Sequence, residues 1–127
     1  MIPKFRAWLK KEQKMDNYID HISWLEDELY CIGDGITYMV SAEDLVLMQS
    51  TGLFDRNGKE IFEGDILDYR GRKALVRWHG SYASFIYRFV DEPHKQKAEW
   101  KPLYLAYMKC EIIGNIYENP ELLEDKE

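Results

Sequence analysis

Two turn signals lie close together in residues 48–67, and they constrain the fold of this chain more than any other feature. The first is Asn57-Gly58, where both residues tolerate the positive φ that a tight turn requires. The second is Gly64-Asp65, where the aspartate is expected to accept hydrogen bonds from backbone N–H groups. The segment between the two signals is too short for a helix. The stretch therefore predicts a tightly folded connector that sets the register of the following strands.

Short apolar alternations separated by turn signals recur along the rest of the chain. Residues 18–25 fit either a short amphipathic helix or two strand pieces, and their aromatic and β-branched side chains favour strands. An aromatic content of 14% for the whole chain points the same way. The segments predicted to be extended are 2–9, 28–32, 36–40, 45–49, 60–62, 66–70, 73–79, 85–90 and 111–117. We therefore expect a mainly β fold of short antiparallel strands.

The predicted strands fall into two parts, an N-terminal β-rich lobe over residues 1–51 and a second part over residues 52–127. Strands this short can protect their edges only by closing into a barrel or by pairing with a neighbour. Residues 52–119 are therefore expected to form a small antiparallel barrel, followed by a short acidic tail. Within that tail, Pro120 is expected to begin a short terminal helix.

Composition excludes several classes of protein. The chain has 127 residues, enough to bury a continuous core without disulfides or metal. No apolar run is long enough to cross a bilayer, so no membrane association is predicted. The N-terminus lacks the apolar segment of a secretory signal, which places the protein in the cytoplasm. In that compartment Cys31 and Cys110, the only cysteines, are expected to be reduced and partly buried.

The charge balance is unfavourable for a general nucleic-acid binder, because the net charge is -6 and phosphate contacts require clustered Lys and Arg. One basic cluster lies near the N-terminus. A solvated edge that discourages aggregation is the favoured interpretation, and a phosphate-binding patch that includes Lys10 and Lys11 is the alternative. The members of the cluster are Lys4, Arg6, Lys10, Lys11 and Lys14.

No catalytic or metal-binding motif stands out. The three histidines are scattered, without the spacing of metal ligands. The sequence has neither a nucleophile elbow nor a glycine-rich phosphate loop. The carboxylates Glu60, Glu63 and Asp65 could form an acid–base pair, but carboxylates in turns are far commoner. We therefore predict no cofactor, no metal and no catalytic residues, and an enzyme is the less favoured class.

A binding surface remains the better candidate for function. Tyr82 and Trp100 lie in or beside loops and are the aromatic residues expected to contact a partner. Trp78 and Phe85 lie within predicted strands, so core packing is expected for them. Because the net charge is negative, a protein partner or self-association is favoured over nucleic acid.

Three segments together resemble the YopX family of phage and prophage proteins. They are IPKFRAW (2–8), MQSTGLFDRNGKEIFEGDI (48–66) and IGNIYENPELL (113–123). Their order and spacing match the family over nearly the whole chain, and the middle segment is the most specific. Residues 9–45 and 68–112 carry no such signal. The resemblance implies a β-rich fold with an SH3-like barrel portion and self-association, in a bacterial host, but it brings no catalytic residues.

Two hypotheses follow. The first is a non-enzymatic phage accessory protein that forms a homo-oligomer and presents a surface to a host or phage protein. The second is a nucleic-acid-associated module in phage DNA metabolism or regulation, which would use the basic cluster and exposed aromatic side chains.

Overall fold

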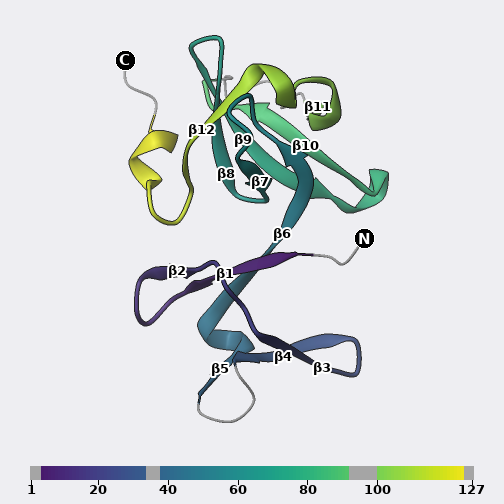
Figure 1. Ribbon diagram of the computed structural model, residues 1–127, viewed down its shortest axis with the longest axis vertical. Helices are drawn as coiled ribbons and strands as arrows, with labels where there is room; N and C mark the ends of the chain where they lie inside the picture. The colour runs from purple at the N-terminus through teal and green to yellow at the C-terminus, as the bar shows by residue number, and fades with distance from the viewer. Residues whose placement is uncertain (1–3, 34–37, 92–99, 125–127) are drawn as a thin grey trace. The chain divides into compact units, whose positions relative to one another are not determined.

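The computed structural model describes residues 4–33, 38–91 and 100–124 (Figure 1). The described residues form strands β1 to β12 and five short 3-10 helices, and they contain no α-helix. The prediction of a mainly β fold with short antiparallel strands is confirmed. The chain divides into two compact units, Met1–Gln49 and Ser50–Glu127, and strand β6 (Leu45–Phe54) contributes residues to both.

The first unit contains two sets of paired strands. Strand β1 lies between β2 and the first half of β6, and β4 lies between β3 and β5, all antiparallel. The preference for strands over a helix in residues 18–25 is confirmed for residues 21–25, which form strand β3. The bounds are β1 Phe5–Leu9, β2 Lys14–Asp16, β3 His21–Leu25, β4 Glu28–Gly33 and β5 Met39–Ser41, followed by the 3-10 helix η1 Ala42–Asp44.

Cross-strand alternation builds the core of the first unit. Ile22, Ile32 and Val40 are directly paired across β3, β4 and β5, so their side chains share one face. Ile32 is fully buried and packs in one cluster with Leu9 and Leu45, while Ile22 and Val40 pack against the edge of that cluster. The apolar period of two in these strands therefore accounts for the core.

The second unit contains a five-stranded antiparallel sheet in the order β11-β10-β9-β8-β12, which curls into a half-barrel (Figure 1). The short strand β7 pairs with the second half of β6. An SH3-like type remains a prediction. The bounds are β7 Glu60–Phe62, β8 Asp65–Tyr69, β9 Arg72–His79, β10 Ser84–Phe89, β11 Lys101–Pro102 and β12 Cys110–Asn115, with 3-10 helices η2 Gly80–Tyr82, η3 Leu103–Leu105, η4 Tyr107–Lys109 and η5 Pro120–Leu123.

Aromatic side chains fill the inner face of this sheet. Tyr87 and Phe89 of β10 are buried, and their rings meet edge to face with centroids 5.6 Å apart. Ile86, on the opposite face of the same strand, is also buried, so both faces of β10 contribute a buried apolar side chain. The prediction that Trp78 lies in the core is wrong, since its side chain is 44% exposed. Trp78 stands near the hairpin end of β9, where its ring packs edge-on against Phe85.

Candidate functional site

The carboxylate of Asp55 is the hub of the first turn in residues 48–67. The side chain is buried and accepts three backbone hydrogen bonds. Its Oδ1 accepts the N–H groups of Asn57 and Lys59, each at 2.9 Å, and its Oδ2 accepts the N–H of Ile112 in β12 at 2.9 Å. Gly58 adopts φ +81, the left-handed conformation that glycine takes without strain. The turn is therefore built locally and is also attached to a strand more than fifty residues away.

Side chains strengthen that attachment. Glu111 of β12 accepts a hydrogen bond on each carboxylate oxygen, at 2.7 Å from Arg56 Nη2 and at 3.2 Å from Asn57 Nδ2. The backbone N–H of Arg56 also donates to the carbonyl oxygen of Cys110 at 2.9 Å. Backbone groups on the outer edge of β12 are therefore covered by the turn, which protects this edge of the sheet from pairing with another chain.

The second turn is bonded in the same way. Gly64 has φ +88, and buried Asp65 accepts the N–H of Phe62 at 2.8 Å. The carbonyl oxygen of Gly64 accepts the N–H of Ile116 at 3.0 Å, which brings the C-terminal segment to this turn. Asn115 holds that segment, because its Oδ1 accepts the N–H groups of residues 117 and 118. We call these bonded turns the signature cluster, formed by residues 55–59, 62–65, 110–112 and 115–118.

The signature cluster uses its polar groups to hold the backbone. Burial alone raises the pKa of Asp55, but the three N–H donors and the charge of Lys59 outweigh it and leave that pKa below its ordinary value. Asp55 therefore stays an ionised acceptor near neutral pH. Burial, with the nearby charges of Asp68 and Asp55, raises the pKa of Cys110 to about 11, so this thiol is a poor nucleophile at neutral pH. Both cysteines are free and buried.

No group of three or more metal-ligating side chains occurs within the described ranges. Nor does any helix found there have the length and apolar character needed to span a membrane.

The predicted basic candidates lie together in the turn between β1 and β2. The Nζ of Lys10 donates to the carbonyl oxygen of Glu43 at 3.1 Å, and Lys11 forms an ion pair with Asp44 at 3.5 Å. Lys14, at the start of β2, pairs with Glu12. These neighbouring acidic residues and carbonyl oxygens reduce the positive field that a phosphate-binding patch needs, which favours the solvated-edge interpretation.

The two predicted aromatic candidates have different outcomes. The backbone of Tyr82 forms part of η2, but its side chain lies outside the described structure. Trp100 lines a groove of about 360 Å³ on the second unit. The groove is bordered by Ser84, Ile86, Trp100, Pro102 and Tyr104.

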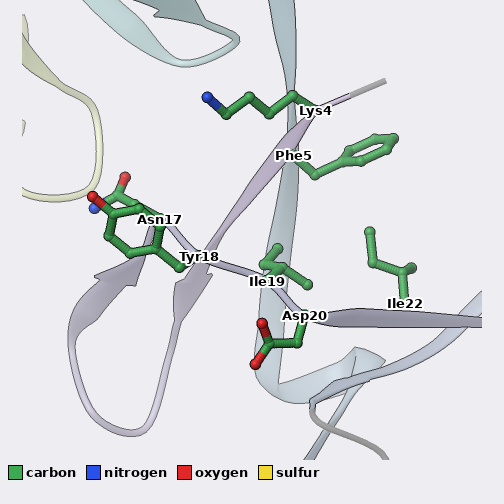
Figure 2. A pocket seen from close by; sticks show the side chains of 7 residues that line it. All are labelled: Lys4, Phe5, Asn17, Tyr18, Ile19, Asp20 and Ile22. Atoms are coloured by element: carbon green, nitrogen blue, oxygen red, sulfur yellow. The ribbon is translucent and has the colours of Figure 1, made fainter. Parts of the chain in front are cut away.

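A second hollow, of about 320 Å³, lies in the first unit and was not predicted (Figure 2). In this view Phe5 and Ile22 lie on one side and Asn17 and Tyr18 on the other. Tyr18 is 87% exposed, which makes it the most exposed large hydrophobic side chain of the described residues. The sequence did contain a signal for this exposed side chain, because Tyr18 directly follows the turn-forming pair Asp16-Asn17. In the structure the Asp16 carboxylate accepts the N–H of Tyr18. The lining residues are Lys4, Phe5, Asn17, Tyr18, Ile19, Asp20 and Ile22.

The outermost strand of the three-stranded sheet also exposes apolar side chains. Trp24 and Leu25 of β3 are 54% and 61% exposed, and Tyr30 of β4 is 54% exposed. Strand β3 has β4 on one side, and within the described part of the chain no strand pairs with its other side. An edge with exposed backbone groups and large apolar side chains is able to pair with another strand.

Comparison with known proteins identifies one family that matches nearly the whole chain. The YopX protein family matches residues 4–124. No curated protein matches the sequence. Among solved structures, the chain is similar to the crystal structure of protein EF1440 from Enterococcus faecalis, with 32% sequence identity and a TM-score of 0.65. That similarity covers 98% of this chain and 99% of the other. The chain therefore belongs to the YopX family.

Proposed function

We propose that this protein is a non-enzymatic, self-associating interaction module, acting as a phage or prophage accessory protein in the bacterial cytoplasm. The observation that carries the proposal is the outer edge of β3, which pairs with no other described strand and has exposed Trp24 and Leu25. A second copy presenting the same edge would extend the sheet through a symmetric, antiparallel pairing of the two β3 strands.

The other sheet edges have features that oppose pairing with a second copy, so β3 is the edge best suited to it. Strand β2 has Lys14 and Asp16, β11 has Pro102, and β12 is covered by the signature cluster. Strands β5 and β7 are also edge strands, but each is only three residues long. Strand β3 has five residues, HISWL, and contains neither Lys, Arg nor Pro.

The signature cluster supports the non-enzymatic part of the proposal. Its Asp and Asn side chains accept backbone N–H groups, and the Glu111 carboxylate is engaged by Arg56 and Asn57. Carboxylates used in this way stabilise turns and leave little capacity for acid–base work.

The test is the mass of the protein in solution, measured by light scattering and analytical ultracentrifugation over a range of concentrations. We expect the native chain to form oligomers, and Leu25→Lys to raise the dissociation constant about tenfold or more, because a charge would be placed on the paired edge. Leu105→Lys is the matched control, since Leu105 in η3 is 68% exposed but does not lie on a sheet edge.

Two results would contradict the proposal. One is a native chain that remains monomeric at the highest concentration reached. The other is an equal loss of association in Leu25→Lys and Leu105→Lys, which would show that the β3 edge has no special role.

A further inference from the structure

Charge is distributed unevenly along this acidic chain. Residues 70–91 and 100–109, which the structure describes, contain seven Lys and Arg against one Asp, a net charge of +6, whereas the whole chain has a net charge of -6. The same segment supplies β9, β10, β11 and η3, and therefore all the residues that line the groove at Trp100. The positive charge of this segment favours an anionic ligand over a cationic one.

Strand register places basic side chains beside the groove. Ile86, which lines the groove, is paired directly with Arg77 of β9, and Ser84 is paired with His79. Directly paired residues point to the same face of a sheet. Arg77 is exposed, and it therefore stands next to the groove on the β9 side.

Arg88 borders the groove at another point. It follows Ile86 by two positions on β10 and so shares its face of the sheet. Its guanidinium carbon lies 5.3 Å from the centroid of the Trp100 ring. The Arg88 Nε is buried and has no hydrogen-bond partner among the residues that the structure describes. The Arg88 guanidinium therefore places a positive charge beside an aromatic ring that lines the groove.

We propose that this groove binds single-stranded nucleic acid, with bases stacked on Trp100 and Tyr104 and phosphates held by Arg77 and Arg88. Tyr104 is 60% exposed and Trp100 is partly exposed, so both rings are accessible. Base–aromatic stacking within a basic groove is the usual way in which proteins bind single strands without sequence preference. An acidic peptide could pair with the two arginines. It would not offer one planar ring after another to stack on Trp100 and Tyr104, as the bases of a nucleic acid do.

The experiment is fluorescence anisotropy with a labelled oligothymidine about 16 nucleotides long, titrated at several salt concentrations. We expect binding at low salt, and for two or three phosphate contacts the slope of log K against log salt should be about −2. Trp100→Leu should weaken binding by about tenfold, and Trp100→Phe, which restores a ring, should recover most of it. Arg77→Ala should weaken binding and reduce the slope by about 0.7.

Lys11→Ala is the matched control, because it removes the same charge from the first unit and should leave binding unchanged. Leu25→Lys should also bind normally, so the outcome is separate from self-association. Circular dichroism of Trp100→Leu and Trp100→Phe is the check that both variants are folded. The proposal is overturned by an absence of binding at low salt, by equal losses in Arg77→Ala and Lys11→Ala, or by binding of an acidic proline-containing peptide without binding of the oligonucleotide.

Discussion

The signature cluster of the second unit and the three-stranded sheet of the first unit differ in whether their side chains are bonded within the fold or left exposed. In the cluster, side chains bond the backbone of distant segments, and Asp55 alone accepts three N–H groups. In the sheet, Trp24 and Leu25 are exposed on an edge that no strand of the described ranges covers. The cluster coincides with the most distinctive part of the sequence, whereas the exposed edge lies in a segment without any such pattern. A distinctive motif here marks a structural requirement, and the candidate binding surfaces lie elsewhere.

Removal of the Asp55 carboxylate should give the largest effect. We expect Asp55→Ala to reduce the free energy of unfolding by about 3–5 kcal/mol, because three backbone donors lose a charged acceptor and the turn separates from β12. Asp16→Ala in the first unit is the control. Its carboxylate accepts the single N–H of exposed Tyr18, so the loss should stay within about 1 kcal/mol.

Urea unfolding of both variants measures the difference. If Asp55→Ala lowered the free energy of unfolding no more than Asp16→Ala does, the signature cluster would not be holding the fold, and its carboxylates would again be candidates for chemistry.

The second turn should be nearly as sensitive. Gly64 has φ +88, a conformation in which a β-branched side chain is strained, and its N–H and carbonyl groups bond Val76 and Ile116. Gly64→Val should therefore destabilise the protein by about 2–3 kcal/mol, measured by thermal and urea unfolding. Gly80→Val is the comparison, since Gly80 has no atom within 4 Å of an added Cβ. If Gly64→Val and Gly80→Val had the same free energy of unfolding, the turn at Gly64 would not be essential for the stability of the fold.

The sequence predicted the local features of this protein better than its long-range ones. Asn57-Gly58 and Gly64-Asp65 were recognised as turns because the conformations of these residues are decided within a few positions. The strands followed from alternation, which also works locally. The bonds from Asp55 to Ile112 and from Arg56 to Glu111 span more than fifty residues, and no spacing rule finds them.

Exposure was the harder quantity to predict at the candidate surfaces. Trp78 was expected in the core because it alternates with Ala74 and Val76, yet it lies where the hairpin runs past the core. Trp100 was proposed as a partner contact because it follows a polar loop, and that role stays a prediction. The basic character of its surroundings was missed, because charge was assessed for the whole chain and at the N-terminus only.

The pH dependence of the free energy of unfolding tests whether two titratable side chains of the second unit are buried. The pKa of Cys110 is raised from 9.0 to about 11, so its thiol is neutral in the folded state where the unfolded chain would be a thiolate. The unfolded state then binds fewer protons, and stability falls as the pH rises from 9 towards 11. Burial also raises the pKa of Tyr87, which contributes with the same sign.

Urea unfolding at successive pH values should therefore show a smaller alkaline loss for Cys110→Ala than for the native chain. The quantity compared is the loss of unfolding free energy between low and high pH in each protein. The destabilisation caused by the cavity at the missing sulfur is present at every pH, so it does not affect this difference. An identical pH dependence in both proteins would show that the Cys110 thiol is solvated in the folded state.

The smallest effect is expected at Glu60, and it bears most directly on the contrast between structure and function. The Glu60 carboxylate accepts the Ser50 hydroxyl with an oxygen–oxygen distance of 2.5 Å, and glutamine keeps an acceptor oxygen at that position. Glu60→Gln should therefore change the free energy of unfolding by about 0.5 kcal/mol or less, and should leave both self-association and oligonucleotide binding as in the native chain. A loss of either activity without a loss of stability would mean that residues 48–67 contain a functional carboxylate after all. Unchanged activity and stability, beside a severe defect in Asp55→Ala, would show that the polar residues of this stretch differ in role, with the backbone-bonded ones alone holding the fold.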